Sequence, residues 1–252
     1  YIDAWTRMID LVNSHKKIVK GKPVYPRMHG DDGWYAFAPT PWAEGALECY
    51  FWTLRPHDHA RVSGHNWIAY LDGKNPGFPE SALRGDLGTI RQKVAGMRED
   101  ETTPDTRLAD DPMKFNPATV GTLRQLMMAG LDPGRGAAPL HCRLRYFDPL
   151  QRRAGVPEDV AALIDQMTDS HVRVTLVNTN QLVARRVVVQ TGAYGEHECR
   201  RVTLGDQVTD VEGPAFTVVL APGAGAQLTI ETDRYVNQPT LVFPWDRWKI
   251  GK

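Results

Sequence analysis

Apolar residues in the first half of the chain recur every three or four positions, which places them on one face of a helix. This spacing predicts a helix that begins at Ile2 and further helices over residues 40–55, 79–98 and 117–130, with a shorter one between residues 57 and 73. The most regular apolar stripe belongs to the helix over 79–98 and consists of Leu83, Leu87, Ile90, Val94 and Met97.

The pattern changes near residues 131–139, after which apolar and polar residues alternate with the period of two that is typical of strands. A short helix over residues 157–167 is predicted to interrupt these strands. Short strands separated by turn residues indicate an antiparallel β-sandwich. We therefore predict an α+β protein with a helical region over residues 1–135 and a β-sandwich domain over residues 136–252. The predicted strands span residues 140–147, 171–178, 185–191, 198–204, 216–221 and 226–235.

The composition is that of a soluble globular protein, long enough for one large domain or two ordinary ones. Of the 252 residues, 42% are apolar and 24% are charged. The 30 basic residues balance the 30 acidic ones, so no net field would attract nucleic acid or an anionic membrane. We therefore predict neither as a partner. No apolar run approaches the ~20 residues that span a bilayer, and no signal peptide is recognisable.

Cys49, Cys142 and Cys199 are widely spaced in apolar or strand-like surroundings, which predicts buried free thiols. Unpaired cysteines without a signal peptide favour a cytoplasmic location. The chain begins at Tyr1 without a methionine, and we expect a processed chain or a fragment. The glycines near residues 130–136 lack the spacing of a phosphate loop, and no cofactor is predicted.

The stretch over residues 25–42 holds the densest group of chemically useful side chains. Asp31 and Asp32 lie between two glycines, which predicts a tight turn that directs both carboxylates to one place. The flanking Trp34 and Trp42 offer flat apolar surfaces for a substrate. The alternative is a solvated turn whose aspartates cap backbone amides while the aromatic residues pack into a core.

One acid/base scheme uses carboxylates. Glycoside hydrolysis requires two carboxyl groups on either side of the scissile bond, one protonated and one ionised. A loop pair and a helix pair that are close in sequence meet this requirement, although the helix pair could equally be solvated. The four candidates are Asp31, Asp32, Glu44 and Glu48.

A second scheme is that of a lyase. Such an enzyme abstracts the proton beside a uronate carboxylate with a histidine or tyrosine base, and an arginine or asparagine neutralises the resulting enolate. The candidate bases are His29 and Tyr35, and the candidate partners are Arg107 and Asn116.

Histidines outside this stretch are interpreted as structural. His57 and His59 resemble a fragment of a metal site, but no third ligand is evident, and no metal is predicted. The triplet over residues 196–198, Glu-His-Glu, is interpreted as a solvated turn. Another group alternates along one predicted strand as a basic stripe, and we expect it to meet acidic neighbours; it consists of His141, Arg143 and Arg145.

Helical hairpins with long acidic and aromatic loops, followed by a β-sandwich, resemble the C-terminal part of carbohydrate-active enzymes that join an (α/α) toroid to β-sandwich domains. Glycoside hydrolase and polysaccharide lyase families share this architecture. The resemblance covers the whole chain at the level of architecture. It implies a carbohydrate substrate and a helical region that is part of a larger toroid.

These observations favour a carbohydrate-processing enzyme portion that cleaves glycosidic bonds by acid/base chemistry of the hydrolase type. The alternatives are a polysaccharide lyase with a His or Tyr base and a non-catalytic subunit or protein-interaction module. The chain has fewer helices than a closed toroid needs, which would leave apolar helix faces exposed. We therefore expect an N-terminal companion region, a second chain or self-association to cover them.

Overall fold

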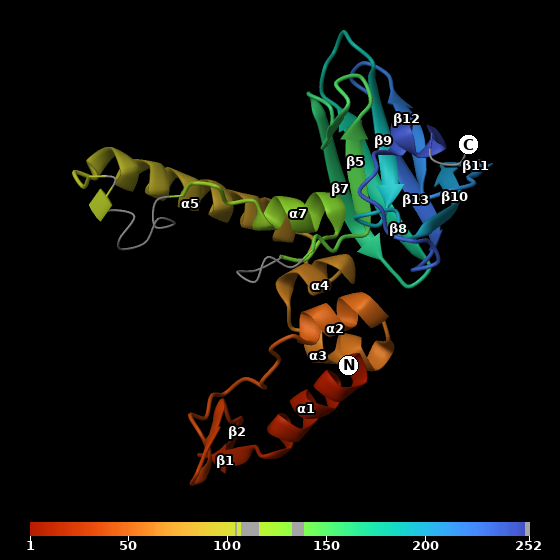
Figure 1. The fold of residues 1–252 in the computed structure, drawn as a ribbon. Coiled ribbons are helices and arrows are strands. Elements are labelled where there is room, and N and C mark those ends of the chain that lie inside the picture. The colour runs from red at the N-terminus through yellow and green to blue at the C-terminus, as the bar shows by residue number, and fades with distance from the viewer. Residues whose placement is uncertain (104, 107–115, 133–138, 250–252) are drawn as a thin grey trace. The chain divides into compact units, whose positions relative to one another are not determined.

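The structure, a computed structural model, describes residues 1–103, 105–106, 116–132 and 139–249. By their contacts the residues form two compact units, Tyr1–Ala69 and Tyr70–Lys252. The fold is α+β, as predicted: α-helices come first and antiparallel β-sheets that pack together follow (Figure 1). The helices of the described residues form no toroid, which corrects that part of the prediction.

The first unit combines helices with two small β-hairpins. Helix α1 packs against α2, and α2 packs against α3. The core of the unit contains Phe51 and Trp67, whose rings stack with their centroids 6.1 Å apart. The elements are α1 (Ile2–Ser14), β1 (Lys17–Val19), β2 (Lys22–Val24), β3 (Met28–Gly30), β4 (Gly33–Tyr35), α2 (Ala46–Thr53), α3 (Pro56–Val62) and α4 (Asn66–Leu71), which crosses into the second unit.

Helix α2 begins later than the sequence pattern predicts, at Ala46 instead of near Thr40. Gly45 precedes it with φ at +72°, a left-handed conformation that strains other residues. A Cβ atom at Gly45 would lie 2.4 Å from the indole nitrogen of Trp5. The close contact between this backbone and α1 therefore determines where α2 begins.

Helices precede the sheets in the second unit. The predicted helix over 79–98 is confirmed as α5 (Phe78–Glu99). The next helix, α7 (Gly121–Met128), is shorter than the predicted 117–130. Helix α7 packs against α5 and against strands of both sheets. No helix in the described residues has the combination of length and apolar character that crossing a membrane requires.

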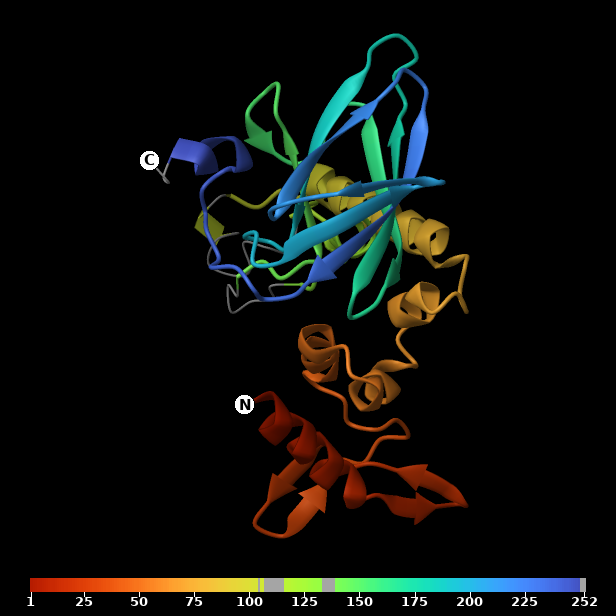
Figure 2. The same cartoon turned by 90° about the vertical axis from the view of Figure 1, so that its right-hand side faces the viewer.

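In the described part of the second unit, nine strands form two antiparallel sheets, one with the order β11-β10-β13-β8-β7 and one with the order β12-β9-β5-β6. Alternate residues point into the core, as in β8, where Val172, Val174 and Leu176 are buried. A short 3-10 helix, η1 (Pro244–Lys249), follows the strands (Figure 2). The strands are β5 (Leu144–Asp148), β6 (Arg153–Ala154), β7 (Val160–Met167), β8 (His171–Asn178), β9 (Arg185–Thr191), β10 (Glu198–Leu204), β11 (Gln207–Asp210), β12 (Ala215–Leu220) and β13 (Gly225–Asp233).

The predicted short helix over 157–167 is wrong, because these residues form strand β7. The pairing of β7 with β8 shifts register between Ile164 and Gln166. This irregularity places Ile164 and Met167 inward with a separation of three residues, which resembles a helical period. The pattern of a bulged strand therefore mimics that of a helix.

The regular stripe on α5 is less buried than its pattern suggests. Leu87 is 51% exposed and Met97 is 49% exposed, whereas Ile164 and Val174 in the larger sheet are fully buried. We expect Leu87→Ala to lower the free energy of unfolding by less than about 1 kcal/mol and Ile164→Ala by about 2–5 kcal/mol. Urea unfolding monitored by circular dichroism measures both. Equal losses in the two variants would show that the α5 stripe is covered in solution.

Candidate functional site

The stretch that the sequence singled out forms a small hairpin in the first unit. His29 pairs with Trp34 across β3 and β4, and Met28 pairs with Tyr35. Because paired residues share a face and neighbours alternate, His29 and Tyr35 lie on opposite faces of the hairpin. The structure therefore does not bring these two candidate bases together.

Asp31 and Asp32 form the turn of this hairpin, and Gly33 follows them with φ at +95°. Both aspartates are exposed. Among the described residues, neither carboxylate takes part in a hydrogen bond or an ion pair. The turn thus presents two solvated carboxylates next to each other.

Trp34 lies between two histidine rings. It stacks on His15 with centroids 5.1 Å apart and meets the edge of His29 at 4.8 Å. Its indole is half-buried by these contacts. Trp34 is thus packed between side chains of its own unit.

Glu44, Glu48 and Trp42 lie around the start of α2. Both glutamates are exposed, and no described hydrogen bond or ion pair joins them to the hairpin aspartates. Glu44 precedes α2, and its carbonyl accepts a hydrogen bond from the indole of Trp5 at 3.0 Å. The backbone of Trp42 exchanges two hydrogen bonds with the Asn13 side chain, at 2.7 and 2.8 Å.

The two predicted enolate partners are placed differently. Arg107 lies outside the described residues. The side-chain oxygen of Asn116 accepts a hydrogen bond from the backbone nitrogen of Ala118 at 2.9 Å. This contact stabilises the turn that leads toward α7.

The histidines over residues 57–59 belong to α3, where the acid between them is structural. Asp58 is buried, and its carboxylate accepts hydrogen bonds from Thr53 at 2.6 Å and Arg61 at 2.8 Å. Within the residues that the structure describes, no group of three or more His, Cys, Asp and Glu side chains is arranged to hold a metal ion.

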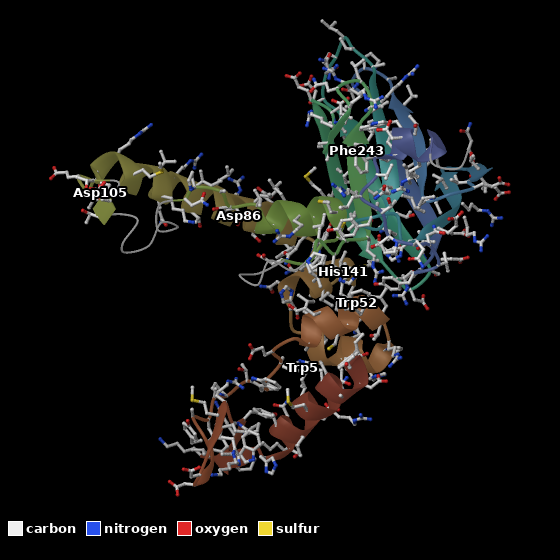
Figure 3. The ribbon with its side chains drawn as sticks, in the orientation of Figure 1. Trp5, Trp52, Asp86, Asp105, His141 and Phe243 are labelled. Atoms are coloured by element: carbon white, nitrogen blue, oxygen red, sulfur yellow. The ribbon has the colours of Figure 1, made fainter. Side chains whose placement is uncertain are left out.

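A denser polar cluster lies in the second unit, at residues that the sequence pattern did not favour. The buried members are Arg143, 2% exposed, and His197, 1% exposed; His141 is half-buried and Tyr235 is 38% exposed. Figure 3 labels His141 close to α7, at one edge of the sheets. We call these four residues the His-Tyr cluster.

A tight turn between β9 and β10 holds His197 in place. Gly192 and Gly195 both have positive φ, and a Cβ atom at Gly192 would lie 2.4 Å from the carboxyl carbon of Glu196. The Glu196 carboxylate accepts hydrogen bonds from the backbone nitrogens of Ala193, at 3.1 Å, and Tyr194, at 2.8 Å. The predicted solvated turn over 196–198 is therefore wrong, because Glu196 and His197 are buried.

His197 is neutral and anchors the cluster. Its Nδ1 atom accepts a hydrogen bond from the backbone nitrogen of Tyr235 at 3.1 Å, and the two rings meet edge to face. The guanidinium of Arg143 lies 3.5 Å from Nε2. Burial, reinforced by the charge of Arg143, lowers the pKa of His197 to about 3.

His141 and Tyr235 form the outer part of the cluster. The Nε2 atom of His141 lies 3.1 Å from the Tyr235 hydroxyl, which is hydrogen-bond distance. Burial and the charge of Arg143 lower the pKa of His141 to about 4. Burial raises the pKa of Tyr235, although Arg143 opposes this by favouring the phenolate. At neutral pH the pair thus contains an unprotonated imidazole and a protonated phenol.

The predicted basic stripe over residues 141–145 lies largely inside the protein. Arg143 is buried next to His197, and Arg145 donates a hydrogen bond to the Ala193 carbonyl at 2.9 Å. Between the cluster residues, Cys142 is fully buried, and burial raises the pKa of its thiol. All three cysteines are buried and free. The sequence contained one indication that His197 is buried. It precedes Cys199, which was predicted to be buried, by two residues, and residues two apart in a strand point to the same face.

Comparison with known proteins yields one partial result. A family model described as a domain of unknown function (DUF8034) matches residues 53–124. The match runs from the end of α2 into α7 and lies before the residues of the His-Tyr cluster. No curated protein and no solved structure matches the chain.

The low pKa of His197 predicts a pH dependence of stability. The unfolded histidine has a pKa near 6.5, so below that pH the unfolded state binds a proton that the native state does not bind. The free energy of unfolding therefore falls as pH drops from about 6.5 toward about 3. Between about pH 7 and about pH 5, the free energy of unfolding should fall by about 2 kcal/mol more in the wild type than in His197→Gln. Urea unfolding at the two pH values measures this.

His29→Gln is the matched control, because it makes the same substitution at an exposed histidine outside the His-Tyr cluster. An identical pH dependence in wild type and His197→Gln would mean that His197 can be protonated in the native protein.

Proposed function

We propose that the chain is part of a carbohydrate-processing enzyme that acts on acidic polysaccharides by proton transfer, in the manner of a lyase. The observation that carries this proposal is the 3.1 Å contact between His141 and Tyr235. General acid/base chemistry needs a proton acceptor and a proton donor within hydrogen-bond reach of each other and of the substrate.

The protonation states give each residue a role. His141 is unprotonated at neutral pH and would remove the proton beside a uronate carboxylate. The electron pair of that C–H bond forms a carbon–carbon double bond as the glycosidic C–O bond on the next carbon breaks. The Tyr235 hydroxyl would give its proton to the leaving oxygen, and Arg143 would stabilise the phenolate that remains. The two protons balance, and no oxidant or reductant is needed.

The charge around the pair favours an acidic substrate. His141 is a weak base in the free protein, partly because Arg143 disfavours its protonated form. A substrate carboxylate beside the imidazole would oppose the charge of Arg143 and raise the pKa of His141. The base would thus become stronger when an acidic sugar is bound. A neutral sugar has no carboxylate and would not raise the pKa of His141 in this way.

The hydrolytic scheme with Asp31, Asp32, Glu44 and Glu48 stays a prediction for the other unit. These carboxylates are exposed, and no described hydrogen bond or ion pair joins the two aspartates to the two glutamates. Their exposure is also compatible with the alternative function, that of a non-catalytic subunit or protein-interaction module. Substitutions in the two units therefore distinguish the three functions.

We expect Tyr235→Phe and His141→Gln each to lower turnover of an acidic polysaccharide by roughly 10²-fold or more, because each removes one proton-transfer group. The assay is the ultraviolet absorbance of the unsaturated product, together with the release of reducing ends. Tyr194→Phe is the matched control: its hydroxyl, which accepts a hydrogen bond from Leu140 at 3.2 Å, lies outside the pair.

Reducing ends without unsaturation, lost in Asp31→Asn or Glu44→Gln but kept in Tyr235→Phe, would replace the lyase with a hydrolase. Wild-type turnover in both cluster variants would remove the His-Tyr cluster from the mechanism. The absence of turnover on every acidic and neutral polysaccharide tested would favour the interaction module.

A further inference from the structure

A cavity of about 520 Å³ lies in the second unit beside strand β12, apart from the His-Tyr cluster. Its volume falls in the range of roughly 300–1,000 Å³ that is usual for small-molecule sites. Its wall is mostly apolar, with three polar side chains. The residues that matter for its chemistry are Val188, Glu212, Thr217, Trp245 and Arg247.

The floor of this cavity is the outer face of the four-stranded sheet. Val187 and Val189 of β9 are fully buried and point into the core, so Val188 between them points the other way. Val188 pairs with Phe147 on one side and with Thr217 on the other, and all three share this outer face. Of these three residues on the outer face, Phe147 is buried, whereas Thr217 of strand β12 is exposed.

The C-terminal segment covers only part of that face. Phe243 and Trp245 stack with centroids 5.0 Å apart, and both meet the edge of Phe147, at 5.8 and 5.9 Å. Figure 2 shows this segment running along the outside of the strands, and Figure 3 labels Phe243 well apart from His141. The aromatic contacts hold Trp245 over Phe147, and the cavity remains over Val188 and Thr217.

Arg247 supplies a half-buried cation to the cavity wall. Its guanidinium donates to the Gln190 side chain at 2.6 Å, to the Val242 carbonyl at 3.4 Å and to the Tyr194 carbonyl at 3.5 Å. A guanidinium carries five N–H donors. The two N–H donors on Nη1, which packs against Gly195, have no acceptor among the described contacts. The side chain is thus fixed in place and still able to bind an anion.

The electrostatics at Arg247 favour a negative ligand. Burial lowers the pKa of Arg247 and the nearby Arg145 lowers it further, whereas Glu196 raises it. Glu196 already accepts two backbone hydrogen bonds in the turn before β10. A carboxylate on the ligand would pair with Arg247 and relieve this repulsion. At the rim, the exposed Glu212 accepts hydrogen bonds and thereby suits a ligand that also has hydroxyl groups.

We propose that this cavity binds a sugar ring that bears a carboxylate, such as a uronate. The carboxylate lies on Arg247, the apolar face of the ring on Val188 and the edge of Trp245, and a hydroxyl on Glu212 or Thr217. None of these residues belongs to the His-Tyr cluster, so the site is independent of the proton-transfer chemistry proposed above.

Isothermal titration of the full chain with D-glucuronate, D-glucose and benzoate tests this site. We expect glucuronate to bind more tightly than glucose and benzoate. Arg247→Gln should weaken glucuronate binding roughly tenfold or more, because it removes a charge-assisted hydrogen bond. Thr217→Leu should weaken it too, because this exposed position lets a larger side chain enter the cavity without changing Arg247. The Thr217→Leu variant still tests the site if Arg247→Gln folds poorly.

Arg201→Gln is the matched control for charge. Arg201 lies on β10 in the other sheet, pairs with Asp210 at 3.0 Å and does not line the cavity. This variant and Tyr235→Phe should bind glucuronate like the wild type, which separates this site from the proposed function. Three results would overturn the inference: no binding of glucuronate up to about 10 mM, tighter binding of benzoate, or unchanged binding in both Arg247→Gln and Thr217→Leu.

Discussion

The second unit depends on how one buried carboxylate is satisfied in the turn between β9 and β10. Glu196 is 7% exposed and takes two backbone hydrogen bonds within its own turn. A buried charge without such partners would be expensive, so the backbone must bring Ala193 and Tyr194 to it. The positive φ of Gly192 and Gly195 makes this path possible. The turn then directs His197 into the core on one side and leaves Gly195 against the Arg247 guanidinium on the other.

The same turn contacts residues of both sites, although the two sites share no residue. His197 accepts a hydrogen bond from the backbone nitrogen of Tyr235, and the negative charge of Glu196 stabilises the charged form of Arg247. Among the described residues, Arg143, Arg145 and Arg247 surround one carboxylate, that of Glu196, so positive charge exceeds negative charge here. Net positive charge in a partly dry environment is unfavourable on its own. An acidic ligand at either site would reduce that cost, which is a physical reason why both proposals concern acidic sugars.

The sequence predicted most of the sheets and much less of the candidate site. Strands β8, β9 and β10 begin and end where alternation placed them, because one face of each packs on the core. Alternation failed at β7, where an irregular register imitates a helical period. The His-Tyr cluster was missed for another reason: it joins residues 141, 197 and 235, which only the pairing of distant strands brings together. Conversely, Asp31 and Asp32 stand out in the sequence because they are adjacent, and the structure shows that adjacency in a hairpin turn leaves them in solvent.

Cys142 gives the His-Tyr cluster a built-in chemical reporter. Cys142 lies between His141 and Arg143 in sequence. Its thiol is fully buried, and its raised pKa keeps it protonated and unreactive while the structure is closed. A thiol reagent can therefore reach it only when the strand segment carrying the cluster opens. The rate of modification of Cys142 thus measures how often the candidate site comes apart in the native protein.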